Sequence, residues 1–171
     1  MNDFTNYIRD IPNFPIQGIT FKDITPLLGD GTAFNAAIEV FAEKYESESI
    51  DTIIGIDARG FIVAAALALR LGVGFVPIRK SGKLPFECYE VTYDLEYGRD
   101  TLAIHKDAFP EGSRVLICDD VLATGGTLAA SIELVQKLGG NIIGIALLIE
   151  LKELEGRKKI ENQPIFSLVE F

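Results

Sequence analysis

Hydrophobic positions along the chain alternate between helix-like spacing and short continuous runs. Apolar side chains three and four positions apart over residues 33–48 predict an amphipathic helix, with Thr32 as a candidate N-cap. A β-branched run over residues 52–56 predicts a strand. The apolar stretch 61–71 that follows predicts a buried helix, which we expect to end at Gly72.

The same alternation continues in the second half of the chain. Apolar runs over residues 73–78, 114–118 and 142–149 predict further strands, and residues 127–138 predict a helix. Near-continuous apolar strands separated by helices are typical of a parallel sheet covered on both faces. The pattern therefore predicts one doubly wound α/β domain over residues 1–171. Such sheets bind ligands beyond the carboxyl ends of their strands.

Residues 79–100 interrupt this rhythm. They combine charged side chains with glycines, a proline and the tyrosines at 89, 93 and 97. A segment this long and polar inside a compact domain is typical of a functional loop or of a hairpin that moves. The segment 14–23 is also irregular and is rich in aromatic residues.

Composition narrows the class of protein. The chain has 171 residues, 48% of them hydrophobic and 24% charged, which is typical of a globular protein. A net charge of −9 argues against a nucleic-acid binder, which normally offers a basic face. The longest apolar run, 61–69, is far shorter than the roughly 20 residues that span a membrane. Cys88 and Cys118 have no metal-site spacing, and we expect a cytoplasmic protein.

The strongest chemical signal lies in residues 115–127. An apolar strand leads to Asp119 and Asp120, and a small, hydroxylated turn at 123–127 then opens a helix. Backbone N–H groups and the helix N-terminus suit that turn to a phosphate. If the strand ends at Cys118, both carboxylates can accept hydrogen bonds from two neighbouring ribose hydroxyls. The alternative is an acidic surface turn that only caps a helix.

The segment Cys118–Thr127 resembles the signature with which type I phosphoribosyltransferases bind 5-phosphoribosyl-1-pyrophosphate (PRPP). The resemblance implies that Asp119 and Asp120 hold the ribose. It implies that the 5-phosphate is held by the turn residues Ala123, Thr124, Gly125, Gly126 and Thr127. It also implies the fold of that family, with a small N-terminal hood over residues 1–30 and a flexible catalytic loop over residues 79–100.

Two basic segments extend the resemblance. Asp57–Phe61 is similar to the pyrophosphate loop of adenine-specific members, which implies that Arg59 reaches toward pyrophosphate and base and that a cis peptide lies near Asp57–Ala58. Taken alone, it is as consistent with a helix start bearing a surface arginine. Residues 76–85 are also similar to these members, which implies that the pyrophosphate is met by Arg79, Lys80 and Lys83. The alternative there is a solvated basic turn.

Two further segments complete the implied site. Tyr93–Gly98 is similar to the mobile lid of the family, with Glu96 and Tyr97 as catalytic candidates. Its alternative is an ordinary β-hairpin. Residues 14–23 are similar to the family's hood, which implies that adenine is contacted by Thr20, Phe21 and Lys22 together with Arg59. Aromatic core packing would also explain that segment. Lys22 stands where members often have arginine.

The resemblance implies an enzyme of purine salvage. It would transfer 5-phosphoribose from PRPP to adenine, giving AMP and pyrophosphate, with Arg59, Glu96, Tyr97 and Asp119 as the catalytic set. Mg²⁺ is expected to be held mainly through the pyrophosphate of PRPP rather than by protein ligands. A homodimer is implied, with residues 61–69 as a candidate contact, and no partner nucleic acid or membrane. The alternatives are transfer to another purine base and a PRPP-binding regulator without catalysis.

Overall fold

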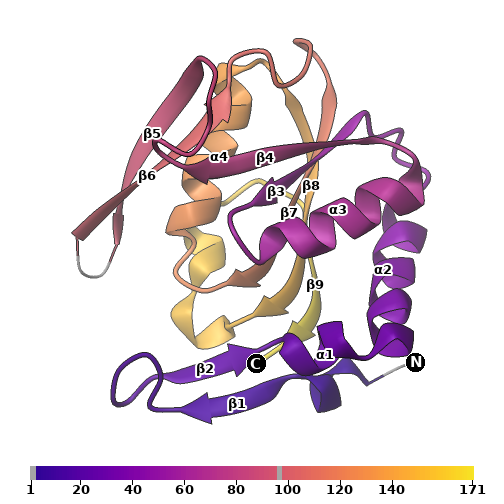
Figure 1. The fold of residues 1–171 in the computed structure, drawn as a ribbon, viewed down its shortest axis with the longest axis vertical. Coiled ribbons are helices and arrows are strands. Elements are labelled where there is room, and N and C mark those ends of the chain that lie inside the picture. Colours follow the sequence, from indigo (N-terminus) through magenta and orange to yellow (C-terminus); the bar gives the residue numbers. More distant parts are fainter. Residues whose placement is uncertain (1–2, 96–97) are drawn as a thin grey trace.

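The computed structural model describes residues 3–95 and 98–171, which form a seven-stranded sheet and a separate two-stranded sheet. The large sheet has the order β5-β6-β4-β3-β7-β8-β9 (Figure 1). Neighbours from β4 to β9 are parallel, whereas β5 and β6 are antiparallel. The strands are β3 (Thr52–Ile56), β4 (Gly74–Lys80), β5 (Cys88–Leu95), β6 (Gly98–His105), β7 (Arg114–Leu122), β8 (Asn141–Glu150) and β9 (Ile165–Glu170).

Helices cover both faces of this sheet, which confirms the predicted doubly wound α/β fold. The α-helices are α1 (Thr25–Gly29), α2 (Gly31–Tyr45), α3 (Gly60–Leu71) and α4 (Gly126–Lys137). The 3-10 helices are η1 (Phe4–Tyr7), η2 (Lys152–Leu154) and η3 (Gly156–Lys159). α2 and α3 lie on one face and α4 on the other (Figure 1), and a separate apolar cluster fills each interface. Among the helices of the described residues, none combines the length and apolar character that a membrane span requires.

Several predicted boundaries agree with the structure. β3 spans the predicted residues, and α3 ends where Gly72 takes a left-handed conformation with φ of 69°. The predicted cap of α2 is wrong. Asp30, rather than Thr32, caps this helix, because its carboxylate accepts hydrogen bonds from the backbone N–H groups of Thr32 and Ala33.

Tertiary pairing changes three other segments. The N-terminal segment, expected to be irregular, pairs as β1 (Arg9–Pro12) with β2 (Thr20–Asp23). Residues 88–95 and 98–100 of the segment 79–100 belong to the β5–β6 hairpin, one of the two possibilities that the sequence left open. β9 was not predicted; it forms the edge of the sheet beside β8. Each of these strands is defined by backbone pairing with its partner rather than by an apolar periodicity of its own.

The sheet opens where the predicted site lies. β7 runs to Leu122, so the expectation that it ends at Cys118 is wrong. Its pairing with β3, however, stops at Gly55 and Cys118, and beyond that point β7 pairs only with β8. The end of β7 therefore borders an opening that β3 no longer fills.

Candidate active site

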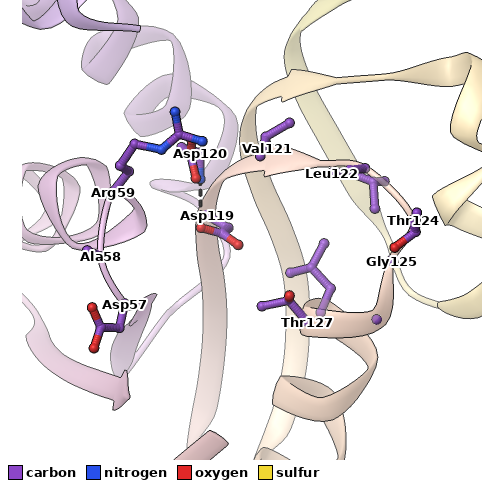
Figure 2. Close-up of a pocket in the computed structure, with 13 residues that line it drawn as sticks. Asp57, Ala58, Arg59, Asp119, Asp120, Val121, Leu122, Thr124, Gly125 and Thr127 are labelled. Atoms are coloured by element: carbon purple, nitrogen blue, oxygen red, sulfur yellow. Dashed lines mark hydrogen bonds and ion pairs between the residues drawn. The ribbon is translucent and has the colours of Figure 1, made fainter. Parts of the chain in front are cut away.

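A pocket occupies this opening beyond the carboxyl ends of β3 and β7. It is lined by residues 57–59 on one side and by residues 119–128 on the other. Figure 2 shows Asp57, Ala58 and Arg59 facing the segment that carries the two aspartates and the turn. The peptide bond between Asp57 and Ala58 is cis, as the resemblance implied. The structure thus brings together the turn at residues 123–127, both aspartates and Arg59, as the sequence predicted.

Asp119 and Asp120 place two carboxyl groups in the wall of this pocket. They are 7% and 5% exposed, and the backbone N–H of Asp120 donates to Asp119 Oδ1 over 2.9 Å. Burial raises the pKa of the Asp119 carboxyl well above its usual range, and the charge on Asp120 raises it further. Burial raises the pKa of Asp120 too, against the opposing effect of Arg59. Burial thus disfavours the charged forms of both carboxyls, and the opposing effects of Arg59 and the nearby backbone N–H groups offset only part of it.

Arg59 links this pair to the N-terminal hairpin. Its Nη2 lies 2.6 Å from Asp120 Oδ2, but not in hydrogen-bonding geometry, so the buried Oδ2 lacks a hydrogen-bond donor among the described residues. The guanidinium also lies 4.7 Å from the centre of the Phe21 ring, within the range of a cation–π contact. Phe21 in turn packs edge to face on Phe14 at 5.3 Å. An aromatic surface therefore lies next to the arginine and the acidic pair.

The turn before α4 has the geometry of an anion cradle. Gly125 occupies the N-cap position of α4 with φ of 81°, a backbone conformation that residues other than glycine rarely adopt. The first N–H groups of α4 follow directly and carry partial positive charge. Tyr93 of β5 reaches this turn, with its hydroxyl 3.2 Å from Thr127 Oγ1. The turn thus joins a helix N-terminus to the β5–β6 hairpin.

The predicted basic cluster is divided in the structure. Arg79 and Lys83 both contact Asp57 Oδ2, at 3.3 and 3.2 Å, next to the pocket. Burial alone would raise the pKa of Asp57, but hydrogen bonds from Lys83 and Arg79 hold it below its usual value. Lys80 instead forms an ion pair with Asp100 of β6 at 2.9 Å. All three basic side chains lie outside the pocket lining formed by the described residues.

The remaining candidates lie on the N-terminal hairpin and the lid. Thr20 is exposed at the start of β2. Lys22 forms an ion pair with Asp10 at 2.7 Å and lies 3.7 Å from the centre of the Phe171 ring. Its charge is therefore engaged at the base of the hairpin. The catalytic candidates at positions 96 and 97, Glu96 and Tyr97, fall outside the described residues.

The structure adds two residues that sequence reasoning did not assign. Gly60 leaves room for Asp119, since a Cβ at position 60 would lie 2.7 Å from Asp119 Oδ1. The absence of a side chain at Gly60 thus lets the carboxylate of Asp119 lie against the start of α3. Tyr93 was noted only as part of the lid segment, and its contact with Thr127 depends on how β5 packs on α4.

Other groups with chemical potential lie elsewhere. Cys118 is fully buried in the core, where a thiol packs as a small hydrophobic group. His105 packs against Phe86 at 6.2 Å. Within residues 3–95 and 98–171, no group of three His, Cys, Asp or Glu side chains is arranged to hold a metal ion. Among the residues that the structure describes, the pocket lining includes the carboxylates of Asp57, Asp119 and Asp120.

Fold and pocket together define a doubly wound α/β protein whose pocket, at the carboxyl edge of the sheet, joins an acidic pair to a turn at a helix N-terminus. The model of the phosphoribosyl transferase domain matches residues 28–169. An adenine phosphoribosyltransferase of Brevibacillus brevis is 56% identical over 169 residues, covering 99% of both chains. The chain therefore belongs to the phosphoribosyltransferase family, within its adenine phosphoribosyltransferase branch.

Solved structures agree with this assignment. Adenine phosphoribosyltransferase from Thermoanaerobacter pseudethanolicus superposes with a TM-score of 0.95 at 54% identity, covering 99% of this chain and 98% of that one. The Saccharomyces cerevisiae enzyme, solved with adenine and D-2,5-dideoxy-2,5-imino-altritol 1,6-bisphosphate, gives a TM-score of 0.93 at 44% identity. The alignment covers 98% of this chain and 97% of that one. The family resemblance inferred from the sequence motifs is thus confirmed.

Proposed function

We propose that this protein transfers the 5-phosphoribosyl group of PRPP to adenine, forming AMP and pyrophosphate. The observation that carries the proposal is the buried pair Asp119–Asp120 beside a glycine-containing turn at the N-terminus of α4. Ribose 5-phosphate supplies what both features lack, because it offers hydroxyl donors at one end and a phosphate at the other. The yeast relative solved with adenine and a sugar-like bisphosphate supports the same choice of ligands.

The ribose is assigned to Asp119 and Asp120. Their buried carboxylates would accept hydrogen bonds from the two vicinal hydroxyls, which offsets the cost of burying the charges. Carboxylates at this position also place negative charge near C1, where positive charge develops as pyrophosphate departs. Asp119 is therefore proposed to orient the ribose and to stabilise the electron-poor ring during transfer.

The 5-phosphate is assigned to the turn before α4. Its binding groups would be the backbone N–H groups and hydroxyls of Ala123, Thr124, Gly125, Gly126 and Thr127. All five line the same pocket as the aspartates, which supports a single sugar-phosphate site.

Arg59 is assigned to pyrophosphate and base. Its position between Asp120 and Phe21 supports a role at the junction of the two substrates. PRPP would compete with the guanidinium for Asp120, freeing Arg59 to meet the pyrophosphate, since a guanidinium fork matches phosphate oxygens. Phe21 would pack on adenine, with Thr20 and Lys22 presenting backbone groups to its edge.

Arg79, Lys80 and Lys83 are proposed to supply further positive charge to the pyrophosphate. Asp57 supports this by holding Arg79 and Lys83 at the edge of the pocket. Mg²⁺ is proposed to be bound mainly by the pyrophosphate oxygens of PRPP, because this ion keeps water and substrate oxygens as ligands and needs few protein atoms. Bound in that way, the ion would neutralise charge on the leaving pyrophosphate.

The segment 79–100 is proposed to act as the lid, with Glu96 and Tyr97 as the remaining catalytic candidates. Tyr93, bonded to the phosphate turn, supports a link between this hairpin and the site. Closure would exclude water that otherwise hydrolyses PRPP. Residues 1–30 are proposed to form the hood above adenine, and the whole chain 1–171 to work as one domain.

We also propose a homodimer that uses the region 61–69. Ile62 is 42% exposed and Leu69 is 85% exposed on α3, and burial of such side chains favours association. A cytoplasmic location stays a prediction, which is supported by the free thiols of Cys88 and Cys118.

The deciding experiment is AMP formation from PRPP and Mg²⁺ with each purine base in turn, followed by chromatography. Turnover with adenine is the expected result. Transfer to hypoxanthine or xanthine instead would show that the enzyme acts on another purine base. PRPP binding without consumption of any base would favour a PRPP-binding regulator. The Lys83→Met variant, which removes one proposed pyrophosphate contact, should raise the KM for PRPP and leave the KM for adenine near its wild-type value.

A further inference from the structure

Residues 150–157 form a support behind the phosphate turn. β8 ends at Glu150, whose side chain is 5% exposed, and the chain then folds into η2 and η3. Figure 1 shows these short helices beside the turn that leads into α4. Residues of η2 and η3 are absent from the lining of the pocket that the described residues form. This segment therefore contacts the turn from outside the pocket lining.

Gly156 makes the contact. A Cβ built on Gly156 would overlap the carbonyl oxygen of Ala123 and lie 3.1 Å from the backbone nitrogen of Gly125. Conversely, a Cβ on Gly125 would overlap the carbonyl oxygen of Gly156. The two glycines thus bring two backbones into direct contact, and this contact limits where the N–H groups of the turn can lie.

An ion pair between the half-exposed Arg157 and the buried Glu150 holds Gly156 in place. Arg157 donates from Nε to Glu150 Oε1 at 2.6 Å and from Nη2 to Glu150 Oε2 at 2.5 Å, a two-pronged geometry that fixes the guanidinium in direction and distance. Ser167 of β9 donates to the same carboxylate at 2.7 Å. The hydrogen bond from Leu151 N to Leu122 O, 2.9 Å long, connects the same segment to the end of β7.

We propose that the Glu150–Arg157 pair and Gly156 are positioning residues for phosphate recognition, acting through the backbone of residues 123–125. The inference rests on the proposed function, since it concerns the turn assigned there to the 5-phosphate. None of these three residues lines the pocket, and their effect is transmitted through packing. Loss of the pair should let the turn relax and weaken phosphate binding specifically, while the base site and the ribose carboxylates stay in place.

The experiment compares Arg157→Met and Gly156→Ala with two matched controls. Lys158→Met removes a neighbouring exposed cation that pairs only with Glu155 among the described residues. Gly31→Ala adds a methyl group where no atom lies within 4 Å. Ribose 5-phosphate binding is measured by titration calorimetry, and the KM values for PRPP and adenine are measured by steady-state kinetics.

Both test variants should weaken ribose 5-phosphate binding and raise the KM for PRPP by about tenfold to a hundredfold, the loss associated with misplacement by up to about 1 Å. The KM for adenine should stay near wild type, and both controls should behave as wild type. Arg157→Lys, which keeps the charge without the two-pronged geometry, should recover part of the loss. Ser167→Ala should give a smaller effect of the same kind.

Two outcomes would overturn the proposal. One is a fall in melting temperature with unchanged KM for PRPP, which would make the segment a general support of the fold. The other is an equal rise in both KM values. Should Arg157→Met fail to fold, the Ser167→Ala and Arg157→Lys variants decide between the same results. A wild-type protein that binds ribose 5-phosphate without converting adenine would refute the proposed function and leave this inference to be judged by binding.

Discussion

Replacing Asp119 by asparagine should abolish turnover and at the same time stabilise the unliganded fold. Asp119 and Asp120 place two carboxyl groups in one buried region of β7. Asparagine retains the oxygen that accepts the backbone N–H of Asp120, and it removes only the charge. A buried charge held for a substrate destabilises the protein until that substrate binds.

The size of the effect follows from Coulomb's law. Two like charges about 6 Å apart repel by about 3 kcal/mol at an effective dielectric constant of about 20. Arg59, 2.6 Å from Asp120, offsets part of this repulsion. We therefore expect a net stabilisation of roughly 1–2 kcal/mol, with about 2–4 °C in Tm for each kcal/mol in a chain of this size. Turnover should fall by about a hundredfold or more, because a charge that stabilises the transition state is lost.

The sign of the pH dependence can be derived from the same burial. Burial raises the pKa of Asp119 above its usual value of 3.8. A carboxyl whose pKa is higher in the folded state loses stability as pH rises from its unfolded pKa through its folded pKa. The stabilisation by Asp119→Asn should therefore be absent below about pH 4 and grow as the pH increases.

Urea denaturation of the unliganded proteins between about pH 3 and pH 8 measures this effect. Asp57→Asn is a control with the opposite sign, because Lys83 and Arg79 hold the pKa of Asp57 below its usual value. That variant should be destabilised at neutral pH. The reasoning would be refuted if Asp119→Asn were less stable than wild type at neutral pH, or if it kept wild-type turnover.

Three further predictions concern neighbouring contacts. Gly60→Ala should lower kcat and reduce the free energy of unfolding by about 1–3 kcal/mol, because the new Cβ would collide with Asp119 Oδ1. A variant with wild-type kinetics and melting temperature would contradict this. Tyr93→Phe should raise the KM for PRPP by a few fold, because it removes the hydrogen bond to Thr127, which is worth about 0.5–1.5 kcal/mol. An unchanged KM would show that this hydrogen bond does not contribute to binding. The hydrogen-bonded guanidinium of Arg157 holds the pKa of Glu150 below its usual value of 4.5. Wild type should therefore be more stable than Glu150→Gln by a constant amount above that pH. This difference should shrink as pH falls through the lowered pKa. A difference that is constant with pH in chemical denaturation would contradict this linkage.

The local part of the site could be predicted from the sequence. The position of β3, the end of α3 at Gly72 and the turn before α4 all depend on a few consecutive residues. Apolar periodicity, a left-handed glycine and a helix N-terminus are local properties. The grouping of both aspartates with the turn also follows from short sequence separation, even though β7 extends beyond the predicted end.

Contacts between distant segments were decided by the tertiary structure alone. Arg59 contacts Asp120 and Phe21, residues separated from it by dozens of positions, and Gly156 contacts Gly125 from the far end of the chain. The basic cluster divided between Asp57 and Asp100 for the same reason, because each cation pairs with the carboxylate that the sheet brings near it. The sequence thus determined which chemical groups are present and how each local turn is built. Packing of the strands determined which of those groups meet, since pairing across a sheet carries no signal in the spacing of residues along one segment.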